Sequence, residues 1–256
     1  HDSMMLCDFN RGRDDYDNDT YRQTRGKFRD TSLNYLIDLD PVRGHLVMRR
    51  AEDGGCPSTF YDLSPDDPTK RTMFRTPVGH TTTVTVDAST ADLSVSKTAV
   101  AGLSVFGRAA SGGPNKGVSL QWVDYHESFD KDDEVRVYFI ADEANYPLAF
   151  HGPESVGRRL DYPIVRMTVA LTNNGPSATI DFRVDRLDAF SGNVAEELWQ
   201  WRATLAYGDE PGQLNMDPAG AGFQVGLTRN STVEPGGLAI FDCLTLTTTP
   251  PTAEAN

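Results

Sequence analysis

The stretch Thr81-Thr82-Thr83-Val84-Thr85-Val86-Asp87 decides the fold class of this chain. Threonine and valine repeat in it with a period of two, which is the spacing at which side chains recur on one face of a β-strand. Both residues are β-branched and favour extended backbone. The stretch therefore predicts a strand whose alternate side chains face a core.

Similar runs flank this stretch on both sides, with Gly-, Pro-, Asn- or Asp-rich turns between them. One such turn, Asn173-Asn174-Gly175-Pro176, is typical of a hairpin. The segment Asn193–Arg202 also fits a helix, but Trp199 and Trp201, two residues apart, favour a strand. The series predicts an all-β sandwich or barrel. We expect strands at Met4–Phe9, Tyr35–Asp38, His45–Arg49, Thr72–Thr76, Val100–Phe106, Val118–Asp124, Glu134–Ala141, Ile164–Thr172, Ala178–Val184, Leu198–Ala206, Gly222–Thr228 and Leu238–Thr247.

The chain reads as one domain with two flanking segments. Residues 1–30 are a hydrophilic strand and loop that we expect to pack on the domain. Residues 31–247 form the sandwich, and residues 248–256 are a Pro- and Thr-rich tail.

The composition excludes several classes of partner. The 256 residues carry 37 acidic against 24 basic side chains, a formal net charge of −13. Polyanion binding depends on phosphate neutralisation by Lys and Arg, so this charge argues against nucleic acid and anionic membrane surfaces as partners. No run approaches the ~20 apolar residues of a membrane span. The composition is typical of a soluble globular protein.

The three cysteines, Cys7, Cys56 and Cys243, form no C-x-x-C pair, which excludes a zinc ribbon. If the terminal strands pair, Cys7 and Cys243 are close enough to form a disulfide, which implies an oxidising compartment. The alternative is two buried free thiols. The chain opens at His1, which follows either from removal of a leader or from an expression tag.

Two pairs of segments resemble the concanavalin A-like lectin/glucanase (LamG-like) jelly rolls. Ala101–Gly107 with Gly117–Trp122 resembles that family's central hairpin. Gly222–Leu227 with Gly237–Leu246 resembles its closing strand pair, which ends in an acidic phrase, here Phe241-Asp242. The resemblance implies a jelly-roll sandwich of two antiparallel sheets, a bias towards glycans, and secretion to an extracellular or periplasmic location. The family contains lectins, glycoside hydrolases, polysaccharide lyases and adhesion modules, so the fold does not select among these functions.

One predicted strand carries candidate catalytic residues for a lyase. Such an enzyme needs a group that neutralises the uronate carboxylate and a Tyr or His that moves the α-proton. Gln121, Tyr125 and His126 lie on or just after this strand, and Arg136 lies on the next. Gln121 and Tyr125 share one face, whereas His126 falls on the other unless a bulge intervenes. Ordinary sandwich surface is the competing interpretation.

A glycoside hydrolase of this fold carries paired carboxylates spaced as Glu-x-Asp-x-Glu. The sequence has no such triplet, and the acidic runs Asp130–Glu134 and Asp142-Glu143 are typical of turns. This lowers the expectation of hydrolase activity.

Aromatic and basic residues supply candidate ligand contacts. Trp122, Tyr138 and Tyr146 could stack on pyranose rings, and Arg158 could bind an acidic sugar. Trp199 and Trp201 could form a second platform, but an alternating Trp pair in a sandwich usually lines the core, and we expect that for at least one of them.

The alternating carboxylates of Asp15, Asp17 and Asp19 resemble the opening of a calcium loop. An EF-hand is excluded, because Thr20 and Gly26 stand where Gly and Glu belong. The alternatives are calcium in an irregular loop and a solvated acidic loop.

The sequence thus favours a secreted β-sandwich that binds a carbohydrate, with a polysaccharide as the expected partner. The alternatives are a jelly-roll polysaccharide lyase, a glycoside hydrolase, and a structural or adhesion module that calcium rigidifies. It specifies neither the glycan nor the oligomeric state.

Overall fold

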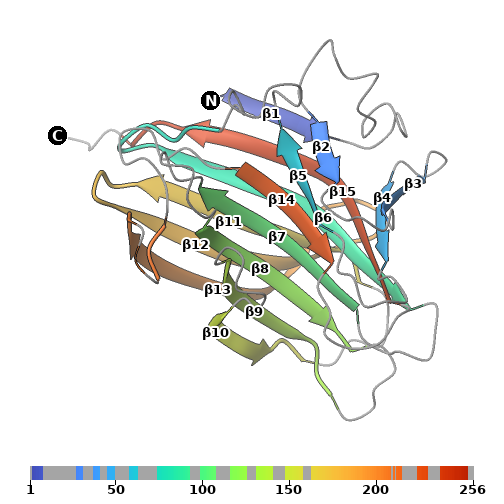
Figure 1. Cartoon of the computed structure of the whole chain (residues 1–256). Helices are drawn as coiled ribbons and strands as arrows, with labels where there is room; N and C mark the ends of the chain where they lie inside the picture. The colour runs from blue at the N-terminus through green and yellow to red at the C-terminus, as the bar shows by residue number, and fades with distance from the viewer. Residues whose placement is uncertain are drawn as a thin grey trace.

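A computed structural model of the chain shows an all-strand architecture (Figure 1). The structure describes residues 2–7, 27–30, 37–40, 45–49, 58–62, 74–92, 99–107, 116–125, 131–140, 148–157, 163–208, 210, 212–214, 224–229 and 237–252. These residues contain no helix long and apolar enough to cross a membrane.

The strands form two antiparallel sheets packed face to face, which is the predicted jelly-roll β-sandwich. The eight-stranded sheet has the order β13-β12-β11-β6-β15-β4-β3, and β1 also pairs with β15. Its strands are β1 (Asp2–Cys7), β3 (Ile37–Asp40), β4 (His45–Arg49), β6 (Thr81–Asp92), β11 (Val165–Asn173), β12 (Ser177–Leu187), β13 (Val194–Ala206) and β15 (Gly237–Thr249). The seven-stranded sheet has the order β10-β9-β8-β7-β14-β5-β2. Its strands are β2 (Lys27–Asp30), β5 (Ser58–Asp62), β7 (Ala99–Gly107), β8 (Lys116–Asp124), β9 (Glu134–Ile140), β10 (Leu148–Ser155) and β14 (Gln224–Arg229).

The core lies between the sheets and is built from alternate residues of the central strands. In β6 the core side carries Val84, Val86 and Ala88, while Thr83, Thr85 and Asp87 are half-buried on the other face. β11 has the same strict alternation of buried and half-buried residues along its length. The period-two pattern read from Thr81–Asp87 is therefore confirmed, and the strand continues to Asp92. We call the side of each sheet that faces away from the core its outer face.

The structure resolves two points that the sequence left open. The segment that also fitted a helix is part of strand β13. The last strand, β15, was expected over Leu238–Thr247 and spans Gly237–Thr249, with Thr249 opposite Thr81.

The terminal strands pair as the disulfide hypothesis required, but no bridge forms. Cys7 lies opposite Leu244 in the register of β1 and β15. Cys243 is a free cysteine in a β-bulge with a left-handed φ of 51°. Burial raises the pKa of its thiol to about 11, and the carboxylates of Asp242 and Asp87 add to the effect. Cys243 is therefore a protonated, weakly nucleophilic thiol at neutral pH.

The two sheets are joined at one edge by a cluster of aromatic and charged side chains. His151 of β10 stacks on Trp201 of β13 with ring centroids 4.1 Å apart and an interplanar angle of 1°. Glu154 accepts hydrogen bonds from His151 Nε2 at 2.8 Å and from the indole N–H of Trp199. On the core side, Phe182 also stacks on Trp201. Both tryptophans therefore pack where the two sheets meet at this edge. Because His151 and Phe182 stack on Trp201, its ring is not free to stack on a sugar.

Replacing Trp201 with Ala is expected to lower the free energy of unfolding by about 2–3 kcal/mol, because the ring packs between His151 and Phe182. The neighbouring Arg202 is the matched control: it is 70% exposed and pairs with Asp181 on the surface. Arg202→Ala is expected to cost less than about 1 kcal/mol. Urea unfolding of both variants tests this, and equal losses would contradict a closing role for Trp201.

Candidate functional site

The candidate site lies on the outer face of the seven-stranded sheet, across β7, β8 and β9. Val118, Leu120 and Trp122 of β8 face the core. Because side chains alternate along a strand, Ser119 and Gln121 face outward. The register places Gln121 opposite Arg136 and Ser119 opposite Tyr138 on β9. On the other side, the same two residues lie opposite Gly102 and Ser104 of β7.

Gln121 and Arg136 form the centre of this site. The Nε–H of Arg136 donates a hydrogen bond to Oε1 of Gln121 at 3.0 Å. Gln121 is only 2% exposed, so its amide is a fixed acceptor. The Arg136 guanidinium also lies 4.9 Å from the ring centroid of Tyr138. The amide and the ring together orient the guanidinium by a hydrogen bond and a cation–π contact.

Arg136 differs from the arginines on the opposite outer face of the sandwich. Each of those pairs with a carboxylate: Arg166 with Asp87 at 2.7 Å, Arg183 with Asp185 at 2.7 Å, Arg186 with Glu196 at 3.2 Å and Arg202 with Asp181 at 2.5 Å. Arg136 has no carboxylate partner among the residues that the structure describes, because its Nε–H binds a neutral amide. Its positive charge is therefore not cancelled by a carboxylate among these residues.

Tyr125 lies next to this pair and is held at both ends. Its hydroxyl donates to Oε2 of Glu134 at 3.1 Å, and its backbone N–H donates to Oδ1 of Asp133 at 3.0 Å. Lys131 Nζ lies 4.9 Å from the ring centroid. Burial, reinforced by the Glu134 carboxylate, raises the pKa of Tyr125 to about 12. The phenol is therefore protonated at neutral pH and can donate a proton, whereas abstracting one requires the phenolate.

Small residues form the floor beside these side chains. Ser104 and Gly102 of β7 lie between β8 and Gly226 and Thr228 of β14. Ser104 donates a hydrogen bond to Ser119 at 3.0 Å, and both hydroxyls are buried. The short side chains of β7 and β8 therefore form a buried floor beneath the half-buried Arg136 and Tyr138.

One predicted ligand contact needs correction. Trp122 is 0% exposed and belongs to the hydrophobic core, with its indole N–H unpaired within the described part of the chain. It therefore presents no face to a ligand. The structure does bring Gln121, Tyr125, Arg136 and Tyr138 onto one outer face.

Several predicted residues lie outside the described ranges. His126, Tyr146 and Arg158 are among them, and so are Asp15, Asp17 and Asp19, so the calcium loop stays a prediction. Within the described ranges no group of three or more His, Cys, Asp or Glu side chains is arranged to hold a metal ion.

Glu134 begins a predicted strand but was not among the predicted site residues, because the acidic run Asp130–Glu134 is typical of a turn. Glu134 is the first residue of β9 and accepts the Tyr125 hydroxyl. The alternation of Val135 and Val137 on the core side was the available signal, since it places Glu134 on the same face as Arg136 and Tyr138.

Comparisons with known proteins concern the fold. No family model and no curated protein sequence matches the chain. Among solved structures, the Lotus tetragonolobus seed lectin matches with a TM-score of 0.46 and 8% identity, over 89% of this chain and 95% of the lectin. Alginate lyase A1-II′ of polysaccharide lyase family 7 matches with a TM-score of 0.46 and 13% identity, over 84% of this chain and 83% of the lyase. The endo-1,3-beta-glucanase of Streptomyces sioyaensis has a TM-score of 0.41 and 13% identity, over 84% of this chain and 79% of the glucanase.

All three matched proteins are concanavalin A-like jelly rolls, the group that the sequence resembles. At these identities the comparison concerns the fold alone, and it says nothing of what this chain binds.

The ionisation of Tyr125 provides a direct test of the site geometry. Its phenolate should form only near pH 12, and Glu134→Gln should lower its pKa, because the substitution removes a negative charge that opposes ionisation. Burial persists in the variant, so the pKa should stay above the ordinary value. NMR titration of ring-labelled tyrosine measures both.

Tyr207 is the matched control for this titration. Burial alone raises its pKa to about 12, so Glu134→Gln should leave its titration unchanged. A Tyr125 that titrates near pH 10 in the unsubstituted protein would contradict the buried, Glu134-bonded phenol.

Proposed function

We propose that the chain binds a polysaccharide across the outer face of the seven-stranded sheet, with Arg136 contacting an acidic group of the ligand. The observation that carries the proposal is the state of Arg136. Gln121 and Tyr138 orient its guanidinium, and no described carboxylate cancels its charge. An oriented guanidinium forms strong, directional hydrogen bonds to a carboxylate or sulfate.

The surroundings of Arg136 also suit a sugar. Pyranose rings carry hydroxyl groups that need hydrogen-bond donors and acceptors, and apolar C–H faces that pack on aromatic rings. Beside the Arg136 guanidinium, the site supplies the half-buried side chains of Tyr125 and Tyr138 on one face.

A second candidate function is a polysaccharide lyase acting at the same site. It is favoured by Tyr125, which holds a proton on the same outer face as Gln121 and Arg136. In this role Arg136 and Gln121 would stabilise the charge that develops on a uronate carboxylate, and Tyr125 would protonate the leaving oxygen. Because the raised pKa keeps Tyr125 protonated at neutral pH, another residue must abstract the α-proton. The sequence analysis offers His126 for this role. Without the Glu-x-Asp-x-Glu triplet, we rank a glycoside hydrolase below both.

Secretion and a calcium-rigidified loop at Asp15, Asp17 and Asp19 complete the proposal. A polysaccharide ligand is consistent with an extracellular or periplasmic location. A structural or adhesion module that makes no use of Arg136 is the competing proposal.

A panel of neutral and uronate-containing polysaccharides tests the proposal, with binding measured by calorimetry and products by mass spectrometry. Binding to an acidic polysaccharide is expected, and Arg136→Ala should weaken it about ten- to a hundredfold, the effect of losing hydrogen bonds to a charged group. Unsaturated oligosaccharide products that disappear in Tyr125→Phe, with binding retained, would establish the lyase.

Arg183 is the matched control, since it is an ion-paired arginine on the outer face of the other sheet. Arg183→Ala should bind like the unsubstituted protein. No binding and no products across the panel, or equal effects of the two substitutions, would contradict a site at Arg136 and favour the structural module.

A further inference from the structure

The hairpin between β12 and β13 carries an unusual exposed side chain. Phe190 is 100% exposed, the highest value among the exposed large hydrophobic residues of the described chain. Single exposed apolar residues are common on protein surfaces, so exposure alone carries no conclusion. The turn that holds Phe190 and the surface beside it make this case different.

The turn is rigid and holds Phe190 away from its own domain. The side chain of Asp188 accepts hydrogen bonds from the backbone N–H groups of Phe190 at 3.1 Å and Ser191 at 2.8 Å. The backbone of Asp188 donates to Asn193 and accepts from Gly192, each at 2.8 Å. Gly192 has a φ of +68°, which glycine adopts without strain. A ring fixed in this way loses little conformational freedom on binding.

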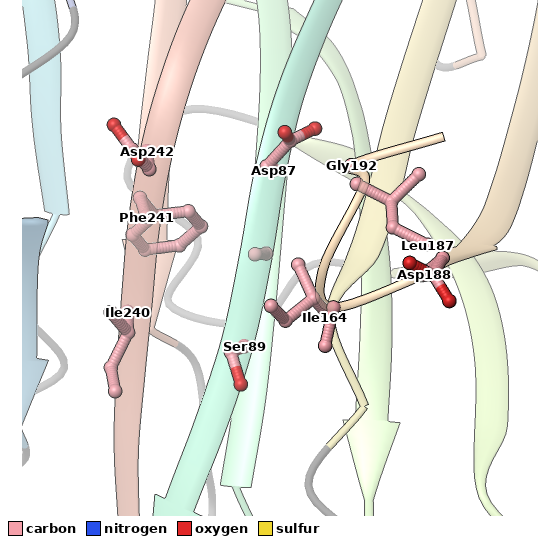
Figure 2. A pocket seen from close by; sticks show the side chains of 11 residues that line it. Asp87, Ser89, Ile164, Leu187, Asp188, Gly192, Ile240, Phe241 and Asp242 are labelled. Carbon is pink, nitrogen blue, oxygen red and sulfur yellow. The ribbon is translucent and has the colours of Figure 1, made fainter. Parts of the chain in front are cut away.

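A hollow of about 150 Å³ lies directly beside this turn, on the outer face of the eight-stranded sheet. Figure 2 shows Ile240 and Asp242 of β15, Asp87 and Ser89 of β6, and the turn residues around it. Its apolar lining comes from Ile164, Leu187, Ile240 and Phe241. A cavity of about this volume lined by aliphatic and aromatic residues accepts a benzene ring. The hollow is open and has polar residues as well as apolar ones in its lining, but its volume is comparable to that needed for a phenyl side chain.

The acidic residues at the rim already have partners. Asp87 forms a bidentate pair with Arg166 at 2.7 and 2.9 Å. Asp188 is engaged by the backbone of its own turn, which lowers its pKa. Asp242 accepts a hydrogen bond from the N–H of Cys243 at 2.8 Å. Arg166 neutralises Asp87, whereas the backbone hydrogen bonds to Asp188 and Asp242 orient these carboxylates without removing their charge.

We propose that two copies of this chain associate through this face, with Phe190 of each copy in the hollow beside the other copy's turn. The Phe190 side chain, which we call the knob, lies beside the hollow on the same surface. Two residues of its turn, Ala189 and Gly192, line the hollow. A two-fold axis between them brings each knob over the partner's hollow, which is the geometry of a self-complementary interface. The candidate site lies on the opposite outer face, so both copies keep it open.

This arrangement has a consequence for polymer binding that rests on the proposed function. Two outward-facing sites on one dimer engage a long polysaccharide at two points, and the second contact forms at high effective concentration. The dimer itself is independent of the ligand, so the two proposals succeed or fail separately.

Sedimentation velocity over a concentration series tests the association. The unsubstituted chain should show a monomer–dimer equilibrium, and added salt should strengthen it, because salt screens repulsion between two chains of charge −13. Phe190→Ser removes two buried rings per dimer and should raise the dissociation constant about a hundredfold or more. Val78→Ser is the matched control, because Val78 is another exposed apolar residue (54%) beside the β11–β12 turn, and it should change nothing.

A mixing experiment separates knob from hollow. Ser89→Phe fills the hollow while leaving Phe190 in place, and should also be monomeric. A mixture of the Phe190→Ser and Ser89→Phe chains restores one of the two contacts, so it should form a heterodimer weaker than the unsubstituted dimer. Circular dichroism melting verifies that each variant is folded.

Three outcomes would overturn the proposal. They are a monomeric unsubstituted chain at the highest concentration tested, a folded Phe190→Ser chain that dimerises normally, and equal loss of dimer with Val78→Ser. A dimer that depends on Phe190 but shows no heterodimer in the mixture would also overturn the exchange of knob and hollow.

Discussion

The alternation of side chains across each strand is the constraint on which this structure depends. Two sheets exclude water between them when most of the alternate residues that face inward are apolar, as they are in β6, β11 and β12. The polar exceptions Thr82, Thr90 and Asn173 are hydrogen-bonded. The alternate residues that face outward do not pack in the core, so polar and charged side chains can occupy these positions. Gln121 and Arg136 are such residues: each lies between two core positions, so the packing that fixes their neighbours also fixes them.

The sequence predicted the fold because this constraint leaves a local signal. Threonine and valine at period two around Val84 and Val86 were enough to establish a half-buried strand, and similar runs gave most of the others. The same reasoning placed Gln121 and Tyr125 together. It could not decide which of the two faces of that strand was the core side, and Trp122 was assigned to a ligand for that reason. The bulk of an aromatic ring suits both environments.

Other features depend on contacts between distant segments, for which the sequence has no local signal. The stacking of His151 on Trp201 joins strands from two different sheets. The orientation of Arg136 depends on the pairing of β8 with β9 in one register. The hollow beside Phe190 forms where the β12–β13 turn meets β6 and β15, which are distant in sequence. Each needs the register and the packing angle of whole strands, and a shift by one residue would reverse every face involved.

The two outer faces differ in how their charges are balanced, and this difference divides their roles. On the eight-stranded sheet, Arg166, Arg183 and Arg202 pair with the carboxylates of Asp87, Glu197 and Asp181 on neighbouring strands. Several threonine hydroxyls bond one another, as in Thr81 with Thr172 at 2.7 Å. Groups satisfied in this way gain little from a polar ligand, which agrees with the proposal that association at this face depends on the apolar contact of Phe190 with the hollow. On the seven-stranded sheet, Arg136 is oriented by neutral partners and keeps its charge. No carboxylate of the described residues pairs with it, and under the proposed function an anionic ligand would do so.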